Sequence, residues 1–327
     1  GSDGDVNYAV RKFPGYGKLS GKSLEELRSG ERVAVLDGKQ DPLDFVLWKS
    51  AKESEPEDAK WDSPFGKGRP GWHIECSAMN SYHLGTHFDI HGGGSDLIFP
   101  HHENEIAQST SAHDGPYVNY WMHTGMVTVE QEKMSKSLNN FLTLREMLQQ
   151  YDGEVLRLFY MTGHYRKPLN FSRGNVDAAR SSLTRLYSVC RLASDSPSTQ
   201  HEQWQARFQQ AMNDDFNTPK ALAVLFVLAR LINQTLISDP DEAAALAATL
   251  KQLGNVLGLL CREPGEWLQS NPLWDQSQLN TIAARVKERE EARQNHEWAR
   301  ADALRLWLEE QGVELEDKGG KTHWKVR

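Results

Sequence analysis

The feature that most constrains the fold is a change of pattern near residue 140. Before it, strand and helix signals alternate around glycine-rich turns: a helix-compatible segment at 72–81, a strand at 88–91 that runs into Gly92-Gly-Gly, and a helix at 101–112. After it, apolar residues recur at helical spacing almost to the end. Alternating strands and helices indicate an α/β sheet, whereas successive helices indicate a bundle. The sequence therefore predicts an α/β domain followed by an all-α region.

The pattern divides the chain into consecutive segments. Residues 1–65 look too small and irregular to fold alone and are interpreted as part of an insertion, with a short helix at 24–27, a strand at 32–36 and a strand or helix start at 44–49. The α/β part spans 66–140, a helical connection 141–180, a helical bundle 181–265, and a last helix with a small hairpin 266–327. Helices are predicted at 144–151, 154–162, 176–193, 201–213, 219–238, 241–259 and 278–312, and hairpin strands at 313–317 and 322–326.

Composition excludes several classes of protein. No apolar run approaches the roughly 20 residues that span a bilayer, and the polar start, Gly1-Ser-Asp-Gly-Asp, has no signal-peptide pattern. The three cysteines, Cys76, Cys190 and Cys261, show no paired spacing, which favours a reducing compartment. A formal net charge of −8 gives no general attraction to nucleic acid, so RNA contacts need local basic surfaces. We expect a cytoplasmic protein, with neither membrane nor DNA among its partners.

A lysine-containing loop, Lys-Met-Ser-Lys-Ser at 133–137, follows a strand signal at 127–129 and precedes the helix at 144–151. Lysine carries a compact charge on a long stem, which suits contact with polyphosphate. Such a pentapeptide is by default a solvated surface loop. Open α/β sheets, however, bind ligands at the carboxyl ends of their strands. The position of the loop therefore favours phosphate binding by Lys133 and Lys136.

Cys76 and the run His-His-Glu-Asn-Glu at 101–105 form a candidate metal site. A helix would present His101 and Glu105, four residues apart, on one face. A thiolate, an imidazole and a carboxylate together favour zinc over calcium or magnesium. Spacing does not choose between His101 and His102, because His102 and Glu105 are three apart on nearly the same face. A buried free cysteine beside a polar helix start is the alternative.

These segments resemble a known family of enzymes. The stretch 123–141 is similar to the second signature motif of class I aminoacyl-tRNA synthetases, and 71–76, 91–96 and 99–105 together resemble the cysteinyl-tRNA synthetases. The resemblance implies the second half of a Rossmann-like catalytic sheet, followed by a helical anticodon-binding bundle and a small terminal α/β region. It also implies ATP-dependent ligation of L-cysteine to tRNA(Cys) through a cysteinyl-adenylate, with Mg²⁺ accompanying ATP.

The resemblance further implies roles for single residues. Lys136 would bind ATP, and Lys133 would help it to stabilise the departing pyrophosphate. Trp72 would line the amino-acid pocket, although an ordinary core tryptophan is the alternative. The backbone would approach the nucleoside at Gly92, Gly93, Gly94 and Asp96. Family members hold zinc with two cysteines, a histidine and a glutamate, and the zinc binds the substrate thiolate, which selects cysteine over serine; the matching positions are Cys76, His101 and Glu105.

Two expected elements do not occur in these residues. Family members carry the other zinc cysteine near their amino terminus, just before a His-x-Gly-His element that binds ATP phosphates. Cys190 and Cys261 lie in the helical region and are interpreted as core or surface thiols. We therefore expect the carboxyl-terminal two thirds of a cysteinyl-tRNA synthetase, beginning inside the connective insertion. These residues alone should not activate cysteine.

RNA binding is expected from the helical half. The stretch 213–221 resembles the anticodon-binding domain of these synthetases, with Asn217 or Thr218 as a helix cap. Residues 318–327 combine Lys318, Lys321, Lys325 and Arg327 with His323 and Trp324, a basic aromatic patch that would stack on an anticodon base unless it is simply a solvated tail. Two other functions stay open: a cysteine ligase of the mycothiol pathway, which the long helical tail disfavours, and a non-catalytic tRNA-binding fragment.

Overall fold

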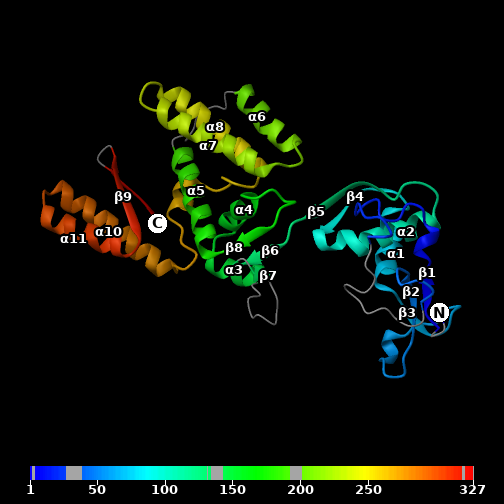
Figure 1. The fold of residues 1–327 in the computed structure, drawn as a ribbon. Coiled ribbons are helices and arrows are strands. Elements are labelled where there is room, and N and C mark those ends of the chain that lie inside the picture. The colour runs from blue at the N-terminus through cyan, green and yellow to red at the C-terminus, as the bar shows by residue number, and fades with distance from the viewer. Residues whose placement is uncertain are drawn as a thin grey trace. The chain divides into compact units, whose positions relative to one another are not determined.

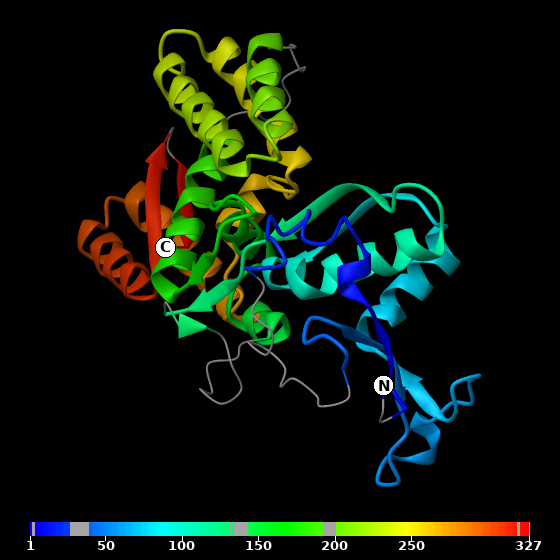
Figure 2. The ribbon, with the colours of Figure 1, turned by 45° about the vertical axis from the view of Figure 1, so that its right-hand side comes forward.

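The computed structural model describes residues 1, 4–26, 39–130, 132–133, 143–191, 201–318 and 321–326. Figures 1 and 2 show the ribbon from two directions. The chain divides into two compact units, Gly1–Met126 and Val127–Arg327. The strand predicted at 32–36 lies outside the described residues, and the described part of the short helix predicted at 24–27 is a turn.

The first unit begins with a small antiparallel sheet in the order β1-β2-β3. Its strands are β1 (Val6–Tyr8), β2 (Phe45–Ser50) and β3 (Gly68–Pro70), and two short helical turns accompany them, η1 (Val10–Lys12) and η2 (Glu57–Ala59). The segment predicted as a strand or helix start at 44–49 is therefore a strand. Val10 and Phe45 share a hydrophobic cluster with Ala107 of a later helix. This amino-terminal piece thus completes its core with residues from outside the sheet.

A β-α-β arrangement forms the rest of the first unit. In chain order it consists of α1 (Trp72–Leu84), β4 (Phe88–Gly94), η3 (Ser95–Leu97), η4 (Ile98–His102), α2 (Glu103–Ala112) and β5 (Val118–Thr124). β4 and β5 are parallel, with Ile90 opposite Tyr120, as expected for strands joined through a helix. Helices α1 and α2 contact one another (Figure 1). β5 is absent from the predicted strands, although its run of Val, Tyr and Trp is typical of a strand.

The second unit opens with a three-stranded sheet in the order β7-β6-β8. β6 is parallel to β8 and antiparallel to β7. The elements are β6 (Val127–Val129), β7 (Glu132–Lys133), α3 (Leu144–Gln150), α4 (Gly153–Met161) and β8 (Leu169–Phe171). Thr143 caps α3 in a capping box with Glu146, and the Asp152 side chain caps α4. The helices predicted at 144–151 and 154–162 are confirmed to within one residue at each end.

A helical bundle follows. It contains α5 (Arg173–Cys190), α6 (Glu202–Asn213), α7 (Thr218–Thr235), α8 (Pro240–Val256) and the short α9 (Pro264–Leu268). The Asn217 side chain caps α7, which decides between the two predicted caps. Leu183, Leu228 and Leu250 are 0% exposed in the shared core, and burying each side chain contributes about 1.5–3 kcal/mol. The predicted helices of this region exist, with ends shifted by up to three residues.

The last segment corrects the prediction of one helix at 278–312. It forms two helices, α10 (Gln276–Gln294) and α11 (Trp298–Glu310), which contact one another. The chain turns at Asn295, and His296 has a φ of 61°, in the left-handed region that a helix cannot continue through. The predicted hairpin is confirmed as β9 (Val313–Lys318) and β10 (Lys321–Val326), and Figure 2 shows it in red beside the orange helices.

The basic aromatic patch predicted at the chain end is wrong in two respects. The indole of Trp324 is only 8% exposed and packs in a core cluster with Leu308 and Val313, so it offers no face to a base. Lys325 lies 3.3 Å from a carboxylate oxygen of Glu314 and 3.3 Å from one of Glu316. These acids lie on β9, and the hairpin brings them beside Lys325 because β9 and β10 pair with each other. The end of the chain is therefore a folded strand whose charges are partly paired.

None of the helices within the described ranges combines the length and the apolar character needed to cross a membrane.

Candidate metal centre

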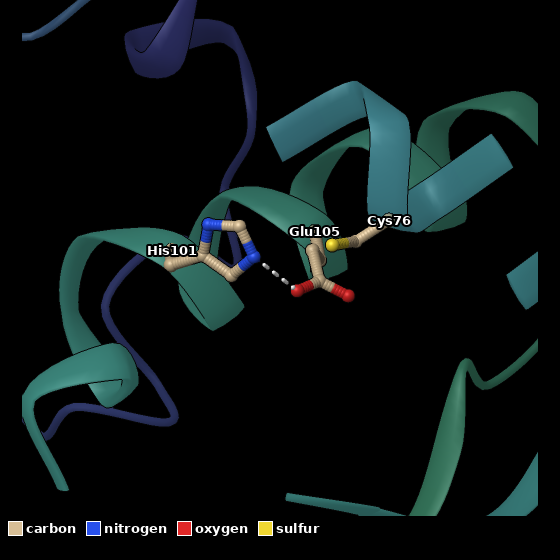
Figure 3. Close-up of side chains that lie close together, drawn as sticks. All are labelled: Cys76, His101 and Glu105. Atoms are coloured by element: carbon tan, nitrogen blue, oxygen red, sulfur yellow. Dashed lines mark ion pairs between the residues drawn. The ribbon is translucent and has the colours of Figure 1, made fainter. Parts of the chain in front are cut away.

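Three side chains from neighbouring helical segments meet in the first unit. Cys76 lies on α1, His101 in the turn η4 and Glu105 on α2. Their ligand atoms all lie within 4.8 Å of one another. Figure 3 shows the sulfur of Cys76 beside the Glu105 carboxylate, with the His101 ring directed at the same carboxylate; the His101 Nε2 and Glu105 Oε1 atoms are 3.0 Å apart. The structure thus brings together the candidate ligands that the sequence separates by up to 29 positions.

The structure also separates the roles of the adjacent histidines. His101 groups with Cys76 and Glu105, whereas His102 groups with His91 and Glu105. The Nδ1 atom of His102 lies 2.7 Å from Nε2 of His123 on β5, inside a buried hydrogen bond. Of these two histidines, His101 is the one that shares a ligand set with the cysteine, a choice that spacing alone leaves open.

Burial and neighbouring charges set the protonation states of Glu105 and Cys76. Glu105 is 0% exposed, and burial by itself raises the pKa of a carboxyl group, but contacts with His101 and His91 lower the pKa of Glu105 to about 2. Burial, reinforced by the Glu105 charge, raises the pKa of the Cys76 thiol above its usual value. At neutral pH the site therefore holds a carboxylate and a protonated thiol. A metal ion bound by Cys76 has to displace that proton.

His73 forms a hydrogen bond with the candidate ligand His101. His73 lies one turn before Cys76 on α1, and its Nδ1 atom is 2.8 Å from Nδ1 of His101. Burial, with the neighbouring His101, lowers the pKa of His73 to about 4, so His73 is neutral at pH 7. Nε2 of His101 is available to a metal when Nδ1 of His101 carries the proton and donates it to Nδ1 of the neutral His73.

Trp72 is the first residue of α1 and borders the cluster. Its ring centroid is 4.5 Å from that of His101, and the side chain is 61% exposed. The alternative of an ordinary core tryptophan is therefore wrong. An exposed aromatic face beside candidate ligands is available to a bound molecule.

Close packing explains why glycines occur at the end of β4. A Cβ atom at Gly92 would lie 2.1 Å from the carbonyl oxygen of Met122 on β5, and one at Gly93 would lie 2.9 Å from Leu97. Only glycine allows this approach of β4 to β5. Gly94 ends β4, and Asp96 follows in η3. Close packing of the strand accounts for Gly92 without any ligand.

Lys133, the first residue of the lysine loop, belongs to the second unit. Lys133 is the last residue of β7, and its backbone pairs with Thr128 of β6. Lys136 lies outside the described residues. The other two cysteines also lie in the second unit: Cys190 is buried in α5, where burial raises the pKa of its thiol to about 12, and Cys261 is exposed. The interpretation of these two cysteines as core and surface thiols is confirmed.

Sequence reasoning missed the residues that surround Glu105 from other elements. His91 contacts its carboxylate from β4, and Tyr117 contacts it from the residue before β5. The histidine directly precedes the glycine triplet, which gives a local signal for a special position. Tyr117 carries no such signal, because its approach depends on the pairing of β5 with β4.

Known proteins resemble this chain both in sequence and in fold. Three relatives named Cysteine–tRNA ligase match the chain: one from Shewanella baltica is 55% identical over 100% of this chain, one from Paraburkholderia xenovorans is 57% identical over 99%, and one from Cronobacter sakazakii is 55% identical over 99%. The chain spans 70% of the length of each. A crystal structure of a LeuRS–tRNA–LeuAMS complex from Agrobacterium radiobacter shares the fold, with a TM-score of 0.50 at 18% identity over 64% of this chain and 33% of its own.

The family model for the class I (C) tRNA synthetase catalytic domain matches residues 1–181, and that for the DALR domain matches residues 207–261. Together with the fold, these matches define a class I aminoacyl-tRNA synthetase with an α/β catalytic part and a helical DALR domain. Class I synthetases use ATP. The catalytic-domain model is that of the class I (C) synthetases, and the relatives are named as cysteine–tRNA ligases. The chain therefore belongs to the cysteine–tRNA ligase family, an enzyme family of ligases.

Proposed function

We propose that this chain forms the zinc-binding and tRNA-binding part of an enzyme that joins L-cysteine to tRNA(Cys) through a cysteinyl-adenylate, in the cytoplasm. One observation carries the proposal: Cys76, His101 and Glu105 converge within 4.8 Å. A thiol, an imidazole and a carboxylate at one point suit zinc, and the same ion suits a thiol substrate.

The residues present fit zinc. The Oε1 atom of Glu105 is buried, makes no well-directed hydrogen bond within the described residues, and lies 3.0 Å from Nε2 of His101, so that one cation could be shared by the two atoms. Cys76, His101 and Glu105 would hold the ion, and bound zinc supplies a soft Lewis acid that prefers a thiolate to a hydroxyl. His73 would keep His101 in the required tautomer. Selection of cysteine over serine then rests on sulfur affinity rather than on pocket size.

Other residues of the chain would bind the rest of the substrates. Trp72 would cover the amino acid beside the cluster, and Lys133 and Lys136 would neutralise the phosphates of ATP, accompanied by Mg²⁺. Catalysis of this kind needs no side-chain nucleophile, because the substrate carboxylate attacks the α-phosphate and the protein supplies position and charge. The glycines and Asp96 remain candidates for the nucleoside, although packing against β5 already explains Gly92.

The helical bundle supports tRNA as the partner. The DALR match at 207–261 covers α7 and α8, whose buried faces form one core with α5. A bundle with a continuous buried core can present a rigid surface to RNA, and the overall charge of −8 requires that surface to be locally basic.

The test uses the purified chain in two measurements. Equilibrium dialysis should show that the zinc-loaded chain binds L-cysteine and not L-serine, and that Cys76→Ser loses the binding. Filter binding should show tighter binding of a tRNA(Cys) transcript than of a non-cognate tRNA, with Cys76→Ser as the matched control that keeps tRNA binding. Equal binding of cysteine and serine, or no preference for tRNA(Cys), would contradict the proposal. Cysteine binding without tRNA binding would favour the mycothiol-type ligase instead.

Cysteine activation itself is a separate measurement. These residues carry no His-x-Gly-His element, so we expect no cysteine-dependent ATP–pyrophosphate exchange from them alone. Exchange that Lys136→Ala abolishes would contradict that expectation and would support the ligase chemistry directly.

A further inference from the structure

The two carboxylate oxygens of Glu105 have unequal surroundings. Oε2 lies 2.8 Å from Nε2 of His91 and accepts a hydrogen bond of 3.0 Å from the hydroxyl of Tyr117. A third contact of 3.4 Å comes from the side-chain amide of Asn80. Within the part of the chain that the structure describes, Oε1 makes no well-directed hydrogen bond; it lies 3.0 Å from Nε2 of His101 and faces the cysteine. One oxygen is thus fully occupied by the protein, and the other is directed into the candidate metal site.

The groups on Oε2 must act as donors. A carboxylate only accepts hydrogen bonds, so the ring nitrogen of His91 that faces it carries the proton. Asn80 also donates to the oxygen of Tyr117 at 2.9 Å, which leaves the tyrosine hydroxyl hydrogen for Glu105. The contacts form one connected network around a single oxygen.

The network is held by separate elements. Asn80 is on α1, His91 is on β4, and Tyr117 immediately precedes β5. Tyr117 is 4% exposed and its ring packs against Phe88 with centroids 5.2 Å apart. Because β4 and β5 pair with each other and α1 packs on α2, the three donors are fixed before any ligand arrives.

We propose that His91, Tyr117 and Asn80 are positioning residues that make Glu105 a one-oxygen ligand through Oε1. This inference rests on the proposed zinc site. A carboxylate can bind a metal through one oxygen or both. Binding through both would require Oε2 to move away from the protons that His91 and Tyr117 direct at it. Holding Glu105 to one oxygen keeps a coordination position open on the ion for the thiolate of the substrate, as a substrate-binding zinc site requires.

A second arrangement of the same residues is the main competitor. His91, His102 and Glu105 also lie within 4.8 Å of one another and could hold an ion of their own. In that case His91 would be a ligand rather than a donor, and the chain would bind two zinc ions. Metal stoichiometry separates these assignments.

The experiment measures zinc affinity by competition with a chromophoric chelator, and zinc content by elemental analysis, on the purified chain. Tyr117→Phe removes one donor to Oε2 and also the oxygen that accepts from the Asn80 amide. His91→Leu removes another, and His91→Gln returns an N–H donor in a similar place. Tyr120→Phe is the matched control, because Tyr120 lies on β5 three residues after Tyr117 but is 68% exposed. Circular dichroism checks that each variant is folded.

We expect one zinc per chain, about 10-fold weaker zinc binding in Tyr117→Phe and about 10-fold to 100-fold weaker binding in His91→Leu. His91→Gln should recover most of the loss, and Tyr120→Phe should match the parent chain. With cobalt in place of zinc, Tyr117→Phe should give weaker visible bands than the parent, because a two-oxygen carboxylate raises the coordination number. A merely structural role would not change these bands.

Several results would overturn the inference. Zinc affinity and cobalt bands unchanged in both Tyr117→Phe and His91→Leu would show that Glu105 needs no such positioning. Two zinc ions per chain, with one lost in His91→Leu, would make His91 a ligand. If the parent chain binds no zinc, or if Cys76→Ser binds it equally well, the proposed zinc site fails and the inference fails with it.

Discussion

The folded end of the chain gives a prediction whose size follows from the structure. Asp317 on β9 accepts hydrogen bonds of 2.9 Å from both terminal nitrogens of Arg289 on α10, and one of 2.8 Å from Thr322 on β10. The Arg289 side chain is 8% exposed and that of Asp317 is 36% exposed. Asp317→Asn would leave a nearly buried guanidinium facing a neutral amide that offers one acceptor instead of two.

The expected cost is about 2 kcal/mol. Removing one partner of a fully buried ion pair costs about 3–5 kcal/mol, and this value is reduced here because water reaches Asp317 and because exposed pairs contribute roughly 0–1 kcal/mol. The hydrogen bonds from Arg289 also lower the pKa of Asp317 below its usual value. A carboxyl group with a lowered folded-state pKa stabilises the fold above its unfolded pKa of about 3.9. The difference between the variant and the parent should therefore be complete at pH 7 and shrink as the pH falls below about 4.

Hydrogen exchange with mass spectrometry measures this locally, which suits a chain of more than one unit. Peptides from β9 and β10 should exchange about 30-fold faster at pH 7 in Asp317→Asn, the factor that corresponds to about 2 kcal/mol. Asp302→Asn is the control, since Asp302 is an exposed aspartate on α11. If Asp317→Asn exchanged like Asp302→Asn, the hairpin would not depend on this ion pair and its docking on α10 would be refuted.

Three further predictions concern the second unit. Trp324→Ala should destabilise the hairpin by about 3–5 kcal/mol, seen as exchange of its peptides at the rate of an unfolded segment, because the indole fills the core. Tyr187→Phe removes a hydroxyl that donates to Glu154 at 2.8 Å, and the free energy of unfolding in urea should fall by about 1–2 kcal/mol; no change would mean that water replaces the hydroxyl. Iodoacetamide at pH 8 should label Cys261 in the folded chain and Cys190 only after unfolding, because Cys190 is buried and its thiol pKa is raised to about 12; peptide mapping that finds both labelled equally would contradict the fold of α5.

The helices were predictable from local signals, and the exceptions have physical reasons. Apolar spacing and caps such as Thr143 and Asn217 lie within a few residues of the helix ends that they define. The break between α10 and α11 carries no glycine or proline, so the left-handed turn at His296 leaves no mark in the pattern. The burial of Trp324 depends on helices that precede it in the chain. Local sequence therefore predicts where a helix or strand begins and ends better than it predicts which other elements that helix or strand will pack against.

The candidate site shows the same division. The spacing of His101 and Glu105 is a local property of one helical segment, whereas their convergence with Cys76 was a hypothesis from residue chemistry that the family resemblance strengthened. The donors on the second oxygen of Glu105 come from three elements, and one of them precedes a strand that was not predicted. Contacts of this kind arise from tertiary packing, which single-sequence periodicity does not encode.

Zinc-edge X-ray absorption on the zinc-loaded chain, with and without L-cysteine, tests the central claim most directly. The account predicts one sulfur at about 2.3 Å from Cys76, with nitrogen and oxygen ligands at about 2.0–2.2 Å. L-Cysteine should add a second sulfur to the shell, and L-serine should not. A shell without sulfur, or one that L-cysteine leaves unchanged, would contradict a zinc site that selects the substrate by its thiol.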